Sequence, residues 1–283
     1  MADKLNHLIN MDLFTLKNKI IIVTGASGLL GREHVEAIAT FGGTPILIDL
    51  NQQVLDEQVI LLNKKYNTNA SGYAVDITNE FEVKNNQEII INKYKKIDGL
   101  VNNAANNPKI ENNTKINFSR LENFPLDIWQ NDLDVALKGT FLCIKYFGFV
   151  ISNNKNGGSI VNISSDLGLI APDQNLYKIK GVEADKQPVK PITYSVVKTG
   201  VIGITRYVST YWSDKNVRCN AICPGGVENN QDPEFISELI KRIPLNRMAN
   251  KSEYRGLLVF LLSDASSYIN GSIITADGGR TAW

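Results

Sequence analysis

The chain has 283 residues, which is enough for one large α/β domain or two small ones with a substantial core. Its 30 basic and 29 acidic residues nearly cancel, and neither a basic run nor an acidic tail points to nucleic acid. Three cysteines without metal-ligand spacing and only two histidines favour a reduced, metal-free, cytoplasmic protein. The first 18 residues lack a continuous apolar core, so they predict neither a signal peptide nor a membrane span.

Short β-rich apolar runs alternate with longer amphipathic segments along the chain. Strands are expected at 20–23, 45–48, 73–75, 100–101, 159–163, 217–222 and 272–276. Helices are expected at 31–41, 54–66, 80–94, 126–151, 195–212 and 252–262. This alternation is typical of right-handed βαβ units and a sheet covered on both faces. We therefore predict the α/β class, with one doubly wound Rossmann-type domain over 14–283, a mostly or wholly parallel seven-stranded sheet, and an N-terminal extension at 1–13.

Glycines 25, 28 and 31 lie where the first strand turns into a helix. Glycine permits a tight turn and lets the backbone approach a pyrophosphate, while the helix N-terminus offers free N–H groups to that anion. A glycine-rich turn without a ligand is the alternative. The strand before and the helix after the turn favour dinucleotide binding.

Asp49 ends the second strand and can accept hydrogen bonds from the ribose hydroxyls of NAD. A carboxylate there repels the extra phosphate of NADP, although Arg32 is near enough in sequence to neutralise that phosphate. The sequence therefore favours NAD over NADP. Asp76 ends the third strand, where contact with the adenine and a loop-capping role are equally plausible.

Tyr194 and Lys198 are four residues apart, so a helix places the phenol and the ammonium on one face. A free tyrosine has a pKa near ~10, and a nearby cation favours the phenolate. The pair could thus act as a tuned acid and base. The alternative is a non-functional surface pair, an exposed aromatic ring beside a solvated lysine. The surrounding motifs must decide between a functional pair and a surface pair.

Six short motifs follow one another from about residue 14 to the C-terminus. They are Thr24-Gly25-x-x-Gly28-x-x-Gly31, Asn102-Asn103-Ala104-Ala105, Asn162-Ile163-Ser164-Ser165, Tyr194-x-x-x-Lys198, Pro224-Gly225 and Asp277-Gly278-Gly279. Together and in this order they resemble the short-chain dehydrogenase/reductase family, in its short single-domain branch. The resemblance implies an NAD(P)-dependent oxidoreductase that acts on a secondary alcohol or ketone.

The resemblance also assigns roles to residues. Tyr194 would exchange the substrate proton, Lys198 would lower the phenol's pKa and hold the nicotinamide ribose, and Ser165 would polarise the substrate oxygen. Ser164 would face the other side of its strand. Val227 would lie near the nicotinamide carboxamide and Ile222 on its ring, with ordinary core as the alternative for both. The implied cofactor contacts are Gly25, Ser27, Gly28, Leu29, Leu30, Gly31, Asp49, Asp76, Ile77, Asn103, Ala104, Ala105, Tyr194, Lys198, Pro224, Gly225 and Val227.

The segments 117–125, 166–173 and 277–283 are similar to a subgroup associated with flagellin glycosylation and nonulosonic-acid sugar pathways. This similarity implies a polar, sugar-derived substrate. The family resemblance further implies a homo-oligomer, a tetramer or a dimer, in which the helices at 126–151 and 195–212 pack across an interface.

The chain departs from the family pattern in three places. The glycine spacing is more like that of the longer, sugar-nucleotide-processing branch. Ala136 stands where the family has an asparagine that helps to hold a proton-relaying water, so we expect backbone and water to keep that relay. Ser165 and Tyr194 are separated by an insertion at about 170–191, whereas the family resemblance implies a much shorter connection.

A loop between the catalytic serine and tyrosine must rise over the substrate mouth. Its lysines could attract a phosphate or carboxylate and Tyr177 could stack on a ring, while a solvated surface loop is the equal alternative. The lysines are Lys178, Lys180, Lys186 and Lys190, partly offset by Glu183 and Asp185. Arg120 and Lys115, in a second polar stretch, are weaker candidates for contact with an anion. The segment 224–247, with its glycines, is expected to close over the site.

Two rival functions remain open from sequence. One is an NADP-linked ketone reductase of general metabolism, and the other is a non-catalytic dinucleotide-binding sensor. Intact Ser165, Tyr194 and Lys198 argue against a sensor, and Ala136 is the one residue that favours it.

Overall fold

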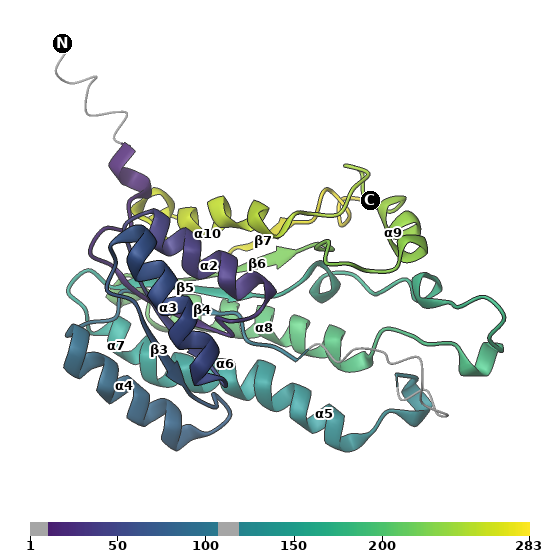
Figure 1. The fold of residues 1–283 in the computed structure, drawn as a ribbon, viewed down its shortest axis with the longest axis horizontal. Coiled ribbons are helices and arrows are strands. Elements are labelled where there is room, and N and C mark those ends of the chain that lie inside the picture. The colour runs from purple at the N-terminus through teal and green to yellow at the C-terminus, as the bar shows by residue number, and fades with distance from the viewer. Residues whose placement is uncertain (1–10, 107–118) are drawn as a thin grey trace, which may run out of the picture.

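In the computed structural model, which describes residues 11–106 and 119–283, seven parallel strands form one sheet (Figure 1). The strand order β3-β2-β1-β4-β5-β6-β7 reverses direction between β1 and β4. Ile22 of β1 pairs with Ile46 of β2 on one side and with Leu100 of β4 on the other. The strands are β1 (Ile20–Thr24), β2 (Thr44–Asp49), β3 (Ser71–Ala74), β4 (Gly99–Asn102), β5 (Gly158–Ile163), β6 (Val217–Pro224) and β7 (Ile273–Ala276). The predicted fold class and all seven predicted strands are confirmed.

Helices cover both faces of the sheet because successive strand residues point to opposite sides. Helices α2 (Leu29–Thr40), α3 (Gln52–Tyr66) and α10 (Arg255–Leu262) contribute to the core of one face. Helices α4 (Glu80–Tyr94) and α8 (Ile192–Tyr211) cover the other, together with the long helix that ends at Ser152. Figure 1 shows α9 (Pro233–Ile240) apart from both layers, at the end of the molecule toward which the strands point.

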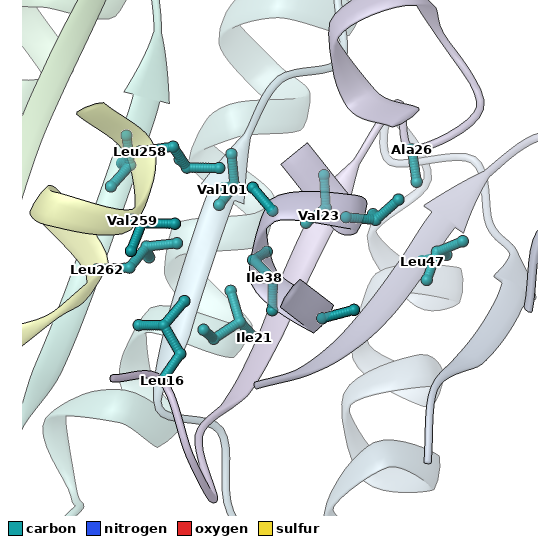
Figure 2. Packing of buried hydrophobic residues seen from close by; sticks show 14 of the residues in the cluster. Leu16, Ile21, Val23, Ala26, Ile38, Leu47, Val101, Leu258, Val259 and Leu262 are labelled. Atoms are coloured by element: carbon teal, nitrogen blue, oxygen red, sulfur yellow. The ribbon is translucent and has the colours of Figure 1, made fainter. Parts of the chain in front are cut away.

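Alternating side chains of β1 divide the apolar interior into two cores. Ile21 and Val23 face α2 and α10, where Ile38 and Leu258 pack against them (Figure 2). Ile20 and Ile22 belong to the core of the opposite face. Each fully buried aliphatic side chain contributes about 1.5–3 kcal/mol. The strand ends that carry the site are therefore held from both sides.

Residues Leu126–Ser152 form one long helix: α5 (Leu126–Leu133), α6 (Gly139–Cys143) and α7 (Phe149–Ser152), joined by two π-helical turns. This helix is long and apolar enough to cross a membrane by length and composition alone. Phe147 and Ile151 are nevertheless fully buried against the sheet. Core helices pass the same test, and the packing identifies this helix as one of them.

Helix α8 begins earlier than predicted, at Ile192 instead of 195, directly after Pro191. Proline favours a helix start because its fixed φ suits the first turn, a signal that the sequence prediction did not use. Tyr194 thus lies in the first turn of α8. The insertion before it contains two short 3-10 turns, Gln174–Tyr177 and Ala184–Lys186. Lys115 lies outside the described residues.

Candidate active site

A cavity of about 660 Å³ opens at the carboxyl ends of the strands, where the strand order reverses. Parallel α/β sheets bind their ligands at this position, and the volume is in the range of cofactor sites. Every residue predicted to contact a cofactor lines this cavity except Gly31, and so do all three predicted catalytic residues. Predicted residues from seven segments of the sequence therefore meet at one place.

The glycine turn between β1 and α2 is constrained by close backbone contacts. Gly25 has a φ of +62°, and a Cβ there would lie 2.9 Å from the Cα of Ala104. A Cβ on Gly31 would lie 2.0 Å from the carbonyl oxygen of Gly25. Gly31 thus supports the turn from beneath, which is why it does not line the cavity. Gly28 is the N-cap of α2 and makes no side-chain cap, so it leaves backbone N–H groups available at the cavity.

Asn103 holds the end of β4 against the glycine turn. Its Nδ2 donates to the carbonyl oxygens of Thr24 and Gly25, both at 3.0 Å. The Oγ1 of Thr24 accepts from the backbone N–H groups of Asn103 and Ala104, both at 3.1 Å. These bonds fix the shape of the glycine turn. In this structure the Asn103 side chain therefore positions the backbone of that turn.

Asp49 faces the glycine turn from the end of β2. Its Oδ2 accepts from the backbone N–H of Ser27 at 2.9 Å and from its hydroxyl at 2.5 Å. Arg32 is exposed, and its Nε donates to the Ser27 carbonyl at 2.8 Å. Asp76 accepts from both the N–H and the hydroxyl of Thr78 at 2.8 Å, which is the predicted loop cap, and it also lines the cavity.

Ser165, Tyr194 and Lys198 meet at the other end of the cavity. The Nζ of Lys198 donates to the carbonyl of Ile163 at 3.0 Å and lies 5.9 Å from the Tyr194 ring centroid. A hydrogen bond joins the side chains of Ser165 and Tyr194. Ser164 donates to the carbonyl of Lys198 at 2.8 Å, so it fixes α8 to β5. Ser164 also lines the cavity, so the expectation that it faces the other side of its strand is wrong, although its hydroxyl is used by the Lys198 carbonyl.

Burial raises the pKa of the Tyr194 phenol, and the hydrogen bond with Ser165 opposes that rise. The expectation that Lys198 lowers this pKa is wrong for this structure. Burial lowers the pKa of Lys198 itself to about 8, and its ammonium is directed at the Ile163 carbonyl. Desolvation is thus the largest cause of the pKa shift of both groups.

Asp166 and Arg280 form a buried ion pair beside Ser165 that sequence analysis missed. The Nη1 of Arg280 donates to Asp166 at 2.7 Å, and the two side chains are 8% and 4% exposed. Ser165 donates to the other carboxylate oxygen of Asp166 at 2.8 Å. Asp166 directly follows Ser165, and Arg280 directly follows the Asp277-Gly278-Gly279 motif. Both residues therefore adjoin motifs that the sequence analysis named, but it gave neither residue a role.

Among the four lysines of the insertion, only Lys190 lines the cavity. Its Nζ lies 3.8 Å from the Tyr194 ring centroid, a cation–π contact, and burial lowers its pKa to about 8. Lys180 pairs with Glu234 of α9, while Lys178 is exposed. Lys186 pairs with Glu183, and Arg120 pairs with Glu122 and donates to the carbonyl of Ala184. The solvated-loop alternative therefore fits Lys178, and Arg120 braces the insertion.

The structure also places Ile222 and Ala136, two further positions that the sequence analysis singled out. Ile222 is fully buried in the core and does not line the cavity, so its predicted contact with the nicotinamide ring is wrong and the core alternative holds. Its side chain points into the layer between sheet and helices. Ala136 is buried within the π-helical turn Asp134–Lys138, next to the cavity-lining Val135. Single π-helical turns often occur at functional sites.

This arrangement defines a class: a dinucleotide-binding oxidoreductase with its reaction centre at the sheet's switch point. Residues 25–281 match the family model described as enoyl-(acyl carrier protein) reductase. A short-chain dehydrogenase/reductase of Botryotinia fuckeliana is 32% identical over 93% of this chain and 96% of its own. The D-threitol dehydrogenase of Mycolicibacterium smegmatis is 29% identical over 95% of each chain.

Solved structures share the fold. A gluconate 5-dehydrogenase from Burkholderia cenocepacia, in complex with NADP and tartrate, superposes with a TM-score of 0.83 at 23% identity, over 96% of this chain and 98% of its own. An NAD⁺-bound xylitol dehydrogenase gives a TM-score of 0.79 at 24% identity, over 93% and 99%. The chain belongs to the short-chain dehydrogenase/reductase family and is an NAD(P)-dependent oxidoreductase.

Proposed function

We propose that the protein transfers a hydride between NAD(H) and a secondary alcohol or ketone of a polar, sugar-derived substrate, with Tyr194 as the acid and base. The observation that carries this proposal is the meeting of Ser165, Tyr194 and Lys198 on the wall of a cavity whose far end is formed by Asp49 and the glycine turn. A sensor has no use for such a proton-transfer group.

The residues present fit a nicotinamide dinucleotide. Gly25 and Gly28 form a tight turn, since a Cβ at either position would lie within 3.3 Å of neighbouring backbone, and the N–H groups at the start of α2 can bind a pyrophosphate. Asp49 stands where ribose hydroxyls can donate to it, although its Oδ2 is shared with Ser27. The bound cofactor supplies the hydride. NAD is preferred to NADP because Asp49 lines the cavity and Arg32 does not.

The chain's own residues handle the proton and the substrate oxygen. The phenol of Tyr194 holds the transferable proton, and its raised pKa keeps it protonated at neutral pH, although it makes the group a weaker acid than a free phenol. Ser165 lines the same end of the cavity, where its hydroxyl donates to Asp166. Lys198, with a pKa near 8, is the next group able to exchange a proton. We propose that backbone and water near Ala136 connect it to solvent.

An anionic, sugar-derived substrate suits the charges at this end of the cavity. Lys190, Lys198 and Arg280 line it as cations, against Asp166 as the one carboxylate there among the described residues. The D-threitol dehydrogenase relative acts on a small polyol by its name. The similarity of 166–173 and 277–283 to the flagellin-glycosylation subgroup supports the same substrate class.

We also propose that the chain assembles as a homo-oligomer, a tetramer or a dimer, in the cytoplasm. Phe141, Phe149 and Tyr207 lie on the predicted interface helices and are each more than half exposed. Exposed aromatic residues on these helices are available for an interaction with a second copy of the chain.

The variant Tyr194→Phe tests the proposal. Purified enzyme is assayed with NAD against D-threitol, xylitol, D-gluconate and glucose 6-phosphate, and NADH binding is followed by fluorescence. We expect the variant to bind NADH within twofold of wild type and to lose at least about a thousandfold in kcat, because the proton has no donor. Equal turnover by both would reject Tyr194 as the acid. Tight NADH binding by a wild type that turns over no alcohol or ketone would favour the sensor.

The variant Asp49→Asn tests the cofactor preference. Wild type should bind NADH at least tenfold more tightly than NADPH, and the variant should reduce that ratio about tenfold because the repelling charge is gone. A wild type that prefers NADPH would support the NADP-linked reductase instead. Arg32→Gln is the matched control, since Arg32 braces the turn from outside the cavity.

A further inference from the structure

The insertion before Tyr194 packs against α9 and forms a small core of its own. Leu176 of the insertion joins Leu239, Ile243 and Met248 in a buried cluster that is separate from the two cores of the sheet. Leu176 and Leu239 also line the cavity. The 3-10 turn Gln174–Tyr177 and α9 therefore meet above the cavity and share one apolar interior. We call this pair of segments the roof.

Polar contacts join the same two segments. Asp173, which caps the turn Gln174–Tyr177, accepts through its Oδ2 from the Nε of Arg242 just after α9 at 2.7 Å, and the Nη2 of Arg242 lies 2.7 Å from the same oxygen. The contact is a charge-assisted hydrogen bond, which is stronger than a bond between neutral groups. Lys180 pairs with Glu234 at 2.8 Å on a more exposed part of the roof. The junction thus has one partly buried, hydrogen-bonded ion pair and one exposed pair, and the exposed pair is the weaker of the two.

Tyr177 is the aromatic side chain that this junction directs at the site. Its ring lies 5.7 Å from that of Phe235 on α9, centroid to centroid, and both residues line the cavity. Burial raises the pKa of the Tyr177 phenol to about 12, and it lies close enough to Arg280, Tyr194 and Asp166 to be affected by their charges. Its hydroxyl makes no hydrogen bond to residues 11–106 or 119–283. The hydroxyl is not among the fully buried unpaired polar atoms of the described residues, so a group bound in the cavity can reach it.

We propose that the roof is one composite unit and that Tyr177 is its specificity-determining residue. The ring packs on a C–H face of a polyhydroxylated substrate, and the hydroxyl donates to a substrate hydroxyl or anionic oxygen. Asp173 and Arg242 are positioning residues that act through Tyr177. This inference rests on the proposed function for the substrate class, but the roof itself does not.

The variant Tyr177→Phe removes the hydroxyl and keeps the ring. With the best of the four compounds named above, we expect KM to rise about tenfold with kcat within threefold, and NADH affinity to stay within twofold. Ligand-observed NMR on the NADH-loaded enzyme measures binding of the same compounds without turnover. Tyr66→Phe, which removes a phenol hydroxyl bonded to Glu36 far from the cavity, is the matched control. A KM and a binding signal equal to wild type would overturn the role of Tyr177.

Hydrogen exchange with and without Asp173→Asn tests the roof itself. We expect faster exchange in 173–179 and in 233–243 together, with β1 and α2 unchanged, and a rise in KM without loss of kcat. Lys241→Gln, which breaks a pair with Glu238 inside α9, should affect α9 alone. Faster exchange in one segment only would overturn the composite roof. If wild type neither binds nor turns over any of the four compounds, the proposed substrate class and the role of Tyr177 fail, while exchange still decides the roof.

Discussion

The two ends of the cavity are built in different ways. The cofactor end is made of backbone: a glycine turn whose shape is held by Thr24 and Asn103 at the tips of adjacent strands. The substrate end is made of side chains from the insertion, α9 and the segment after β7, and it carries charges that are buried in pairs or stacked on a ring. One end tolerates little change in volume, and the other tolerates little change in charge.

The largest expected effect is at the substrate end. Arg280→Met leaves the buried Asp166 carboxylate without its cation, so we expect a loss of about 3–5 kcal/mol in the free energy of unfolding. Urea denaturation measures this loss. Adding Asp166→Asn should restore most of it. Arg247→Met, which breaks the exposed pair with Glu253, should cost under about 1 kcal/mol. Equal losses for the two arginines would contradict the contrast.

At the cofactor end, one added methyl group should be enough to destabilise the fold and weaken cofactor binding. Gly31→Ala places a Cβ 2.0 Å from the Gly25 carbonyl oxygen, so we expect roughly 3 kcal/mol of destabilisation and at least a tenfold loss of NADH affinity. Thermal unfolding and fluorescence titration check both. Gly256→Ala in α10 meets open space and should instead gain up to about 1 kcal/mol. Unchanged NADH affinity in Gly31→Ala would show that the turn adapts.

The buried charge of Lys190 should appear in the pH dependence of stability. Its folded pKa is about 8 against 10.5 when unfolded, so between these values the unfolded chain binds more protons and stability rises with pH. Lys190→Met should therefore exceed wild type by up to about 3 kcal/mol at pH 7, and the difference should shrink toward pH 10. Lys178→Met, at an exposed lysine, is the control. A difference that stays constant with pH would refute the buried charge.

The smallest effect is expected at Ala136. If backbone and water near the π-helical turn Asp134–Lys138 relay the proton, Ala136→Asn should change kcat by less than tenfold. Steady-state kinetics with a solvent isotope effect measure the proton step. A gain in turnover of more than tenfold would mean that the relay is impaired in the natural chain.

Sequence predicted the cofactor end well because it is local: strand, glycine turn and helix are consecutive, and periodicity reports all three. Asp49 followed from its place at a strand end, and Asn103 followed from the family resemblance. The substrate end depends on contacts between distant segments, such as Arg280 with Asp166 or Phe235 with Tyr177, and no single-sequence pattern reports these. The direction of the Tyr194 pKa was missed for a related reason, since burial cannot be read from the spacing of Tyr194 and Lys198.

The cluster formed by Leu176, Leu239, Ile243 and Met248 has a consequence for how such enzymes diversify. Its two halves are far apart in the chain, yet each is covered mainly by the other. Transplanting either half alone into a relative would leave an uncovered apolar surface, whereas both together would carry their own interior with them. The roof is therefore a natural unit of exchange, through which a new substrate range can be acquired without altering the sheet below.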